Sequence, residues 1–263
     1  HMIEIKDISA GYLPAGKVLD NINCDIAEGS FCGIIGRNGA GKSTLLKILC
    51  GLMKPFSGKI IINGTDISRF SKKDLSKTFS FMPQNPDTEL AFSVEEFVMF
   101  GRYPHMNIFK TPSGKDRAAV NEALEFTGTG VLAKRPVNEL SGGEKQKVLM
   151  AQTIVQETGI LVLDEPASHL DIGGQFDILN LLKTLNGRRG KTVIVTLHDL
   201  NAAGEFCDNL ILLQEGRIRN SGKPERVLNR KDIEEVYKTE VAVYKNPVSG
   251  KPYVIPVNKK GCR

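Results

Sequence analysis

The chain has 263 residues, of which 41% are hydrophobic and 25% charged, and this composition is typical of a globular protein with a substantial buried core. Its uninterrupted apolar runs reach only about four or five residues, which excludes a membrane-spanning helix of about twenty. The net charge of +5 is mild and indicates a solvated surface rather than a nucleic-acid-binding face. The five cysteines show no C-x-x-C spacing, so we expect reduced thiols in the cytosol, and neither a zinc site nor a disulfide framework.

The first residues alternate between apolar and polar side chains, and from Phe31 onward strands alternate with helices. Ile3, Ile5 and Ile8 fall on one face, which predicts a small antiparallel sheet that carries Tyr12. The later alternation predicts an α/β core with a mainly parallel sheet. Helical stretches interrupt this core between about residues 87 and 156, and it resumes with strands over residues 160–163, 192–197 and 209–213.

A glycine-rich loop with the sequence GRNGAGKS occupies residues 36–43, between a buried strand over 31–35 and a helix over 44–50. Its glycines let the backbone wrap an anion without Cβ clashes, and its amides converge with a helix N-terminus on that anion. Lys42 would reach the β- and γ-phosphates of a nucleotide, while the Ser43 hydroxyl would join the coordination of Mg²⁺. The predicted nucleotide contacts are Gly36, Asn38, Gly39, Gly41, Lys42, Ser43 and Thr44.

Two adjacent carboxylates, Asp164 and Glu165, follow the apolar run at residues 160–163. Ligands of doubly wound folds bind at the carboxyl ends of strands, so we expect both carboxylates beside the phosphate loop. Asp164 would hold Mg²⁺ through its water shell. Glu165 would polarise the water that attacks the γ-phosphate, because phosphoryl transfer depends on positioning and charge neutralisation.

A second candidate anion site has the sequence Leu140-Ser141-Gly142-Gly143-Glu144, at the start of a helical stretch. The Ser141 side chain and the amides of Gly142 and Gly143 would form it. With this motif the chain resembles the ATPase subunits of ATP-binding-cassette transporters, whose signature reads LSGGQ or LSGGE. The resemblance implies that this site serves the γ-phosphate of ATP held by the other protomer, so that a head-to-tail homodimer sandwiches two ATP molecules.

The same resemblance assigns roles to four further residues. Tyr12 would stack on adenine. Gln84 matches the glutamine that contacts Mg²⁺ and the attacking water and carries motion to the membrane partner. In the segment Ser168-His169-Leu170-Asp171, Asp171 would contact the other protomer. His198, at the end of a predicted strand, matches the histidine that contacts the γ-phosphate.

By resemblance, residues 1–263 form a single cassette ATPase domain of the P-loop nucleotide hydrolase type. Its core, with the antiparallel sheet, would comprise residues 1–86 and 157–222. A helical subdomain carrying the signature would occupy 87–156, and a short C-terminal extension 223–263. We expect the extension to hold a short helix that starts with a proline, a charged helix around residues 231–237, and a hairpin with its turn at 246–250.

The segment from Phe92 to His105, which ends in G-R-x-P-H, resembles ATPases of importers for iron–siderophore chelates, haem and vitamin B12. The ending at residues 247–257 is similar to the same group. Members of this family usually carry arginines after the signature, and this chain has Lys145, Lys147 and Gln152 at those positions. The two lysines keep the positive charge, whereas Gln152 lacks the charge that a structural ion pair would need. The loop from Asp87 to Glu89 is more acidic than usual, which bears on the contact with the membrane subunit.

Together these features predict the ATP-hydrolysing subunit of an importer at the cytoplasmic face of the membrane. Its partners would be a second copy of the chain, polytopic permease subunits and, through these, an external substrate-binding protein, but no nucleic acid. A soluble cassette ATPase acting on DNA or ribosomes is less favoured, because the chain has one phosphate loop, one signature and no coiled-coil insertion. An ATPase for another substrate such as molybdate, and an exporter cassette, stay open as alternatives, since the ATPase does not touch its cargo.

Overall fold

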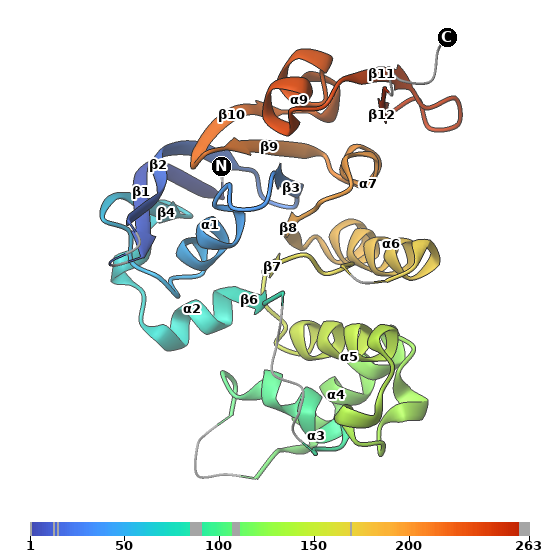
Figure 1. The fold of residues 1–263 in the computed structure, drawn as a ribbon. Coiled ribbons are helices and arrows are strands. Elements are labelled where there is room, and N and C mark those ends of the chain that lie inside the picture. The colour runs from blue at the N-terminus through green and yellow to red at the C-terminus, as the bar shows by residue number, and fades with distance from the viewer. Residues whose placement is uncertain are drawn as a thin grey trace. The chain divides into compact units, whose positions relative to one another are not determined.

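The computed structural model describes residues 2–12, 14, 16–84, 91–106, 111–168 and 170–257 (Figure 1). The chain forms two compact units, His1–Arg69 with Thr192–Arg263 and Phe70–Lys191, which are called the first and second unit below. Within the described ranges, no helix is both long and apolar enough to cross a membrane. The predicted residues Asp87, Glu89, His169 and Cys262 lie outside the described residues.

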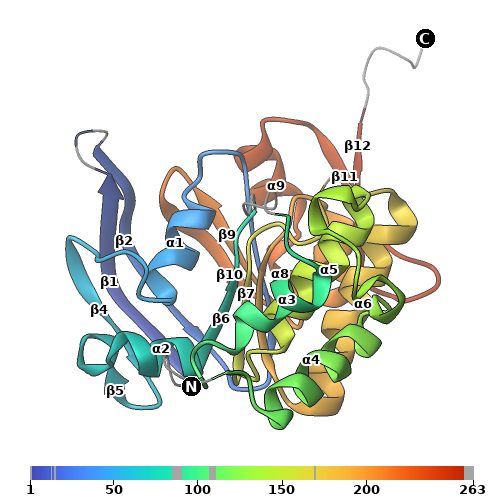
Figure 2. The same ribbon diagram turned by 90° about the horizontal axis from the view of Figure 1, so that it is seen from below.

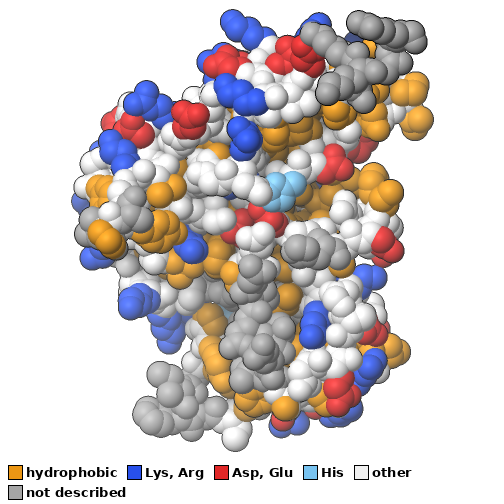
Figure 3. All heavy atoms as spheres, in the orientation of Figure 1, with side chains coloured by type: hydrophobic (Ala, Val, Ile, Leu, Met, Phe, Trp, Pro, Cys, Tyr) orange, Lys and Arg blue, Asp and Glu red, His pale blue; other side chains and the backbone are white. Residues whose placement is uncertain are grey.

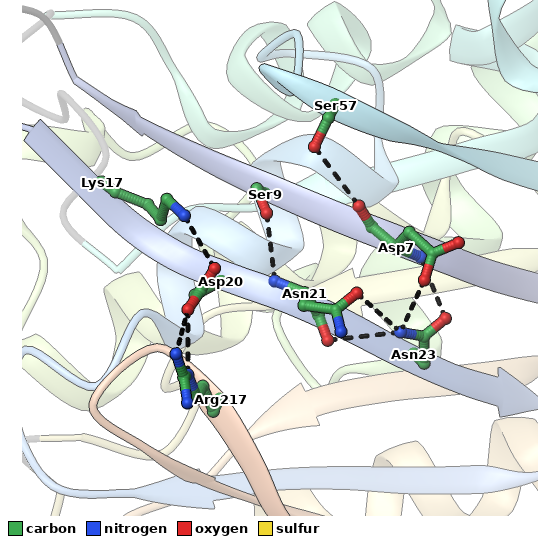
Figure 4. Close-up of polar contacts among 8 residues, drawn as sticks. All are labelled: Asp7, Ser9, Lys17, Asp20, Asn21, Asn23, Ser57 and Arg217. Atoms are coloured by element: carbon green, nitrogen blue, oxygen red, sulfur yellow. Dashed lines mark hydrogen bonds and ion pairs between the residues drawn. The ribbon is translucent and has the colours of Figure 1, made fainter.

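The predicted small antiparallel sheet is confirmed in the first unit. It contains β1 (Ile3–Tyr12), β2 (Gly16–Ile26), β4 (Ser57–Ile62) and β5 (Thr65–Asp66) in the order β2-β1-β4-β5, and Figure 2 shows its first three strands side by side. Ile3, Ile5 and Ile8 are buried, as their alternation predicts. Polar side chains link β1 and β2, where Asn23 accepts a hydrogen bond from the Asp7 backbone amide and donates one to the Asp7 carboxylate (Figure 4).

The parallel core of the first unit is built on β3 (Phe31–Gly36), which pairs in parallel with β8 (Thr192–Thr196) and β9 (Asn209–Gln214). All residues of β3 and β8 are buried, which explains why both strands read as continuous apolar runs instead of alternating. β10 (Arg217–Gly222) returns antiparallel to β9. Helices α1 (Lys42–Leu49) and α7 (Leu200–Phe206) and the short helix η1 (Ile67–Arg69) belong to this unit.

The elements expected in the C-terminal extension are confirmed. They are α8 (Pro224–Val227), with its proline in the first turn, α9 (Arg230–Tyr237), and the hairpin of β11 (Val241–Lys245) and β12 (Pro252–Pro256). Val241 and Val254 on one face of this hairpin are buried. Tyr244, Tyr253 and Ile255 on the other face are exposed, and hydrophobic side chains gather over this hairpin in Figure 3.

The second unit combines a parallel strand pair, β6 (Phe79–Met82) and β7 (Ile160–Leu163), with helices. The helices are α2 (Lys72–Thr78), α3 (Val94–Met99), α4 (Gly114–Phe126), α5 (Gly142–Ile154) and α6 (Ile172–Arg189), with short 3-10 turns η2 (Phe100–Arg102), η3 (Gly130–Leu132) and η4 (Val137–Glu139). Because this compact unit also includes β6, β7 and α6, the helical subdomain over residues 87–156 stays a prediction.

Four of these helices begin in the same way. A serine N-cap accepts a hydrogen bond from the backbone amide of the third helical residue, whose carboxylate in turn bonds the serine, and this reciprocal arrangement is a capping box. The pairs are Ser71 with Asp74, Ser93 with Glu96, Ser113 with Asp116, and Ser141 with Glu144. The last pair begins α5 within the predicted signature.

Candidate nucleotide-binding site

The glycine-rich loop connects β3 to α1, as predicted, and its glycines adopt conformations that other residues rarely take. The φ angles are 148° at Gly36, 80° at Gly39 and 99° at Gly41. A Cβ atom at Gly36 would lie 2.5 Å from the Leu213 carbonyl oxygen, and one at Gly41 would lie 2.5 Å from a Leu19 methyl group. The loop therefore needs glycine at residues 36 and 41 both for backbone conformation and for close packing, and at Gly39 for backbone conformation alone.

Lys42, the first residue of α1, is 5% exposed and its ammonium group turns back into the loop. The Nζ atom donates to the carbonyl oxygens of Gly36 at 2.9 Å and Arg37 at 3.3 Å. Arg37, Asn38 and Gly39 are exposed on the rim of the same loop, and Ser43 is half-buried. The loop thus holds one buried cation under a rim of solvent-facing backbone, which is the charge arrangement that a phosphate group needs.

Tyr12 and His198 are predicted nucleotide contacts outside the loop, and both lie in the first unit. The Tyr12 hydroxyl accepts hydrogen bonds of 3.5 Å from Thr44 Oγ1 and Lys47 Nζ, and the Lys47 ammonium lies 5.7 Å from the ring centre. The ring is therefore brought to α1 and remains 42% exposed. His198 is exposed directly after Leu197, whose amide bonds the Ile34 carbonyl, so the histidine follows the end of β8 beside β3.

In the second unit the structure brings Gln84 and Glu165 together. Gln84 Nε2 donates to Glu165 Oε2 over 2.5 Å, and the Asp164 amide donates to the Met82 carbonyl over 2.9 Å. Asp164 is 4% and Glu165 9% exposed, so both carboxylates are largely withdrawn from solvent. Their predicted place beside the phosphate loop, which belongs to the first unit, stays a prediction.

Glu165 is also one of the few residues other than glycine with a positive φ angle, which is 53°. This left-handed conformation costs a residue with a Cβ atom about 1–2 kcal/mol, so the surrounding structure must hold it there. The Ser168 amide donates to the Glu165 carbonyl at 3.1 Å, and the side chain of Gln146 donates to the carbonyl of Pro166. The turn after β7 is thus fixed on both sides of the carboxylate pair.

The signature residues form the start of α5, and Ser141 is its N-cap. The carboxylate of Glu144 accepts from the Ser141 amide at 2.9 Å and from its hydroxyl at 2.8 Å, and these bonds lower the pKa of Glu144. Gly142 has no atom within 4 Å of its hypothetical Cβ, so the backbone there is open on that side. In this structure the negative charge at the predicted anion site is supplied by the chain's own Glu144.

Asp171, the predicted contact to a second protomer, is exposed and is the N-cap of α6. Its Oδ1 atom accepts a hydrogen bond of 2.8 Å from the Gly174 amide. The geometry therefore gives Asp171 a local structural role, which the sequence did not suggest. A role across a dimer interface is compatible with this cap, because the aspartate remains exposed, and it stays a prediction.

A groove in the second unit, called the apolar groove below, has a volume of about 560 Å³. It lies within the part of the chain that resembles chelate importers, and Phe100 stacks on Tyr103 there with ring centres 5.5 Å apart. Its rim carries both charges, with Glu95 paired to Lys134. The lining residues are Glu95, Glu96, Met99, Phe100, Tyr103, Met106, Pro112, Arg117, Val120, Asn121 and Lys134.

Arg102 and His105 of the G-R-x-P-H segment bind backbone carbonyls at the C-terminal end of α5, next to this groove. The Arg102 side chain is 8% exposed, bonds Asp116 at 3.1 Å and Glu157 at 2.5 Å, and donates to the Val155 carbonyl at 2.8 Å. His105 Nε2 lies 2.8 Å from the Gln156 carbonyl oxygen. Sequence reasoning missed this buried ion pair, because nothing in the local pattern places residues 102, 116 and 157 together.

Gln152, which stands where an arginine is usual, also contacts this region. Its Nε2 atom donates to the Phe97 carbonyl at 3.0 Å, near the end of α3. The amide side chain thus satisfies a helix-terminal carbonyl, a role that requires no charge. The neighbouring replacement Lys147 keeps an ion pair, with its Nζ 3.2 Å from Asp177.

Comparisons with known proteins agree with this geometry. The ABC transporter family model matches residues 19–168. The chain is 37% identical to the achromobactin transport ATP-binding protein of Dickeya dadantii over 98% of this chain and 96% of that protein. It is 39% identical to the ferric enterobactin transport ATP-binding protein of Escherichia coli over 97% of this chain and 93% of that protein.

Solved structures with the same fold extend over nearly the whole chain. One, described as an inward-facing conformation of a putative metal-chelate type ABC transporter, superposes with a TM-score of 0.86 at 28% identity and covers 98% of both chains. Another, the dimeric ATP-binding cassette MJ0796 bound to ADP and Pi, superposes with a TM-score of 0.74 at 29% identity over 85% of this chain and 99% of that one.

Proposed function

The chain belongs to the ABC transporter family as one of its ATP-hydrolysing subunits, and we propose that it powers the import of an iron–siderophore or related metal chelate through a separate permease. The observation that carries this proposal is the identity of 37–39%, over almost the full chain, to transport ATP-binding proteins for achromobactin and ferric enterobactin. A cobalamin import ATP-binding protein of Halobacterium salinarum, at 35% identity, supports corrinoids as a neighbouring cargo class. Haem is a third.

We assign nucleotide binding to the phosphate loop and Tyr12. Lys42 supplies the buried cation for the β- and γ-phosphates, and the exposed rim of Asn38 and Gly39 supplies backbone amides. The Tyr12 ring, held at α1 and exposed, offers a face for adenine. His198 at the end of β8 would contact the γ-phosphate.

Mg²⁺ would be held by the Ser43 hydroxyl, the Gln84 amide oxygen and the Asp164 carboxylate. These are the oxygen donors that Mg²⁺ prefers, and the buried Asp164 carboxylate provides the negative charge. The ion would supply neutralisation of the phosphate charges. Glu165 acts as the base that orients the attacking water, and its hydrogen bond from Gln84 fixes the orientation of the carboxylate.

We further propose that the working unit is a head-to-tail homodimer. The dimeric structures of MJ0796, which are 29–30% identical to this chain, support this assembly. Ser141, Gly142 and Gly143 would then take up the γ-phosphate of the nucleotide bound by the other protomer. That phosphate would replace the Glu144 carboxylate as the acceptor for the Ser141 amide and hydroxyl.

The permease would insert a short helix into the apolar groove, placing this subunit at the cytoplasmic face of the membrane. The groove is lined by stacked aromatic rings and by Met99 and Met106, and such surfaces accept the apolar face of a helix. The external substrate-binding protein would act on this subunit only through the permease, and no step requires nucleic acid.

Co-expression with the neighbouring permease gene tests the assignment to a membrane transporter. The wild-type chain should co-purify with the permease in detergent. Tyr103→Glu, which places a charge on a residue that is 61% exposed in the groove, should lose co-purification and keep the ATPase activity of the isolated subunit. Tyr244→Glu on the exposed face of the hairpin is the matched control and should co-purify normally. Association with DNA or ribosomes instead would favour a soluble cassette ATPase.

A further inference from the structure

Helix α7 begins two residues after His198, and the C-terminal hairpin of β11 and β12 packs on this helix through β12. Both elements belong to the first unit, as does the phosphate loop. With only seven residues, α7 is too short to be stable through its own hydrogen bonds. Contacts with its neighbours must therefore fix its position, and the hairpin is one of these neighbours.

Asn201, in the first turn of α7, makes the most specific of these contacts. Its Oδ1 atom accepts from the Val254 amide of β12 at 2.7 Å, and its Nδ2 atom donates to the Val254 carbonyl at 3.2 Å. Val254 is buried, so its backbone groups need partners within the protein. A single side chain thus satisfies both backbone groups of one strand residue, as a neighbouring strand would.

Two further contacts hold the hairpin on α7. A Cβ atom at Gly204 would lie 3.0 Å from the Pro252 carbonyl oxygen and 3.0 Å from a Leu228 methyl group. Glycine inside a helix lowers its stability, and the close approach of β12 explains why it is present here. In the turn of the hairpin, the Ser249 hydroxyl donates to Glu205 at 2.6 Å. The hairpin is therefore tied to α7 near both ends of the helix.

The first turn of α7 also holds the backbone next to His198. Asp199 is the N-cap of the helix, and its Oδ1 atom accepts from the amides of Asn201 at 2.7 Å and Ala202 at 3.2 Å. On its other side His198 follows β8, a strand whose residues are all buried in the parallel sheet. His198 thus lies between a fixed strand and a short helix whose position depends on the hairpin.

We propose that Asn201 is a positioning residue, which holds the first turn of α7 against β12 and thereby places His198 for its contact with the γ-phosphate. The inference rests on that proposed contact, and it gives the C-terminal extension a part in ATP hydrolysis. A displacement of about 1 Å can cost about 100-fold in rate. ATP affinity depends chiefly on the phosphate loop and Tyr12, so loss of Asn201 affects turnover more than binding.

Steady-state kinetics test this division. Asn201→Ala removes both bonds to Val254, and kcat should fall about 5- to 20-fold while the Kd for ATP stays within about twofold of wild type. Asn201→Asp keeps an acceptor for the Val254 amide and should show a smaller loss of kcat. The matched control Ser249→Ala removes the bond to Glu205, at the other end of the same helix, and should change kcat by less than about twofold. An unchanged kcat in Asn201→Ala, or an equal loss in Ser249→Ala, would contradict the inference.

A double-mutant cycle separates positioning of His198 from a general effect on the fold. His198→Ala removes the side chain that Asn201 positions. Adding Asn201→Ala to His198→Ala should therefore lower the remaining kcat by less than about twofold. The same proportional loss of kcat in both backgrounds would show that Asn201 acts independently of His198, and the inference would be wrong.

Imidazole NMR signals give a readout that needs no turnover, because the chain has four histidines and His198→Ala assigns the signal of His198. Without nucleotide, Asn201→Ala should shift this signal and Ser249→Ala should leave it in place. In a Glu165→Gln chain, saturating Mg-ATP should shift it, and less than half as far once Asn201→Ala is added.

A His198 signal that is unchanged in nucleotide-free Asn201→Ala would overturn the inference. If Mg-ATP does not shift the signal while Asn201 is intact, the proposed γ-phosphate contact of His198 fails instead. The nucleotide-free comparison would then still decide whether Asn201 positions the histidine.

Discussion

Gln84 and Glu165 are joined by a hydrogen bond of 2.5 Å between Nε2 and Oε2, although 81 positions separate them in the chain. The bond orients a carboxylate that is 9% exposed and sits on backbone with a positive φ angle. A strained, buried and oriented carboxylate is characteristic of a functional site. We therefore expect this pair to take part both in ATP hydrolysis and in communication with a membrane partner.

The first prediction separates binding from hydrolysis. Lys42→Ala removes the buried ammonium and should weaken ATP binding about 10- to 100-fold, because charge-assisted hydrogen bonds to phosphate are lost. Glu165→Gln should bind ATP normally and hydrolyse it about 10²- to 10⁴-fold more slowly, because the base is lost. Size-exclusion chromatography of Glu165→Gln with Mg-ATP should show a trapped dimer. A monomer at saturating ATP, or near-normal turnover, would remove Glu165 from its role.

The second prediction concerns the composite site. A protein altered at Ser141 and one altered at Lys42 should each be inactive as homodimers. When they are mixed, heterodimers should retain one intact site and recover part of the ATPase activity. Heterodimer formation can be verified independently with two affinity tags. If tagged heterodimers form and activity does not return, the signature acts within its own chain.

The third prediction is a loss of stability at Arg102. Arg102→Met leaves the Val155 carbonyl and the buried carboxylate of Asp116 without their charged donor, and breaking such a pair should reduce the free energy of unfolding by about 3–5 kcal/mol. Urea denaturation followed by circular dichroism measures this. Lys134→Met, at an ion pair whose lysine is 82% exposed, is the control and should change stability by less than about 1 kcal/mol. Equal effects of the two variants would contradict the assignment.

The fourth prediction is a loss of stability in acid through Asp116. Its pKa lies below the ordinary 3.8, chiefly because the Ser113 hydroxyl donates to it, with further help from the Ser113 amide and Arg102. A carboxyl group whose pKa is lowered by folding stabilises the fold above its unfolded pKa, and that stabilisation is lost as the pH falls through the folded pKa. Unfolding free energies measured from about pH 5 to pH 3 should therefore fall more steeply in wild type than in Asp116→Asn. Parallel curves would show that Asp116 does not contribute.

Sequence patterns were enough to predict those elements that depend only on neighbouring residues. The strand before the phosphate loop, the four-residue strand before Asp164, and the glycines that need a positive φ angle all follow from short-range sterics and burial, and the structure confirms them. The capping box of Ser141 and Glu144 is likewise local, because its S-x-x-E spacing is present in the sequence.

Long-range contacts could not be predicted in the same way. Arg102 meets Asp116 and Glu157 because three separate segments pack together, and Asp232 of α9 accepts a hydrogen bond from Arg219 of β10. Neither pairing leaves a periodic or spaced signal in the chain. Gln152 shows that a single substitution can also mislead. Its departure from arginine suggests a lost ion pair, whereas in the structure its side chain donates a hydrogen bond to the Phe97 carbonyl.

Uptake is the most direct test of the central claim that this subunit drives import of a metal chelate. The chain, reconstituted with the permease encoded beside it and the external binding protein, should accumulate a labelled ferric siderophore inside vesicles in an ATP-dependent manner. Haem, cobalamin and molybdate are assayed in parallel, and Glu165→Gln should abolish all accumulation. ATP-dependent accumulation of the siderophore, or of haem or cobalamin, is the result we predict. Accumulation of molybdate alone, or outward movement of any of these substrates, would contradict the account.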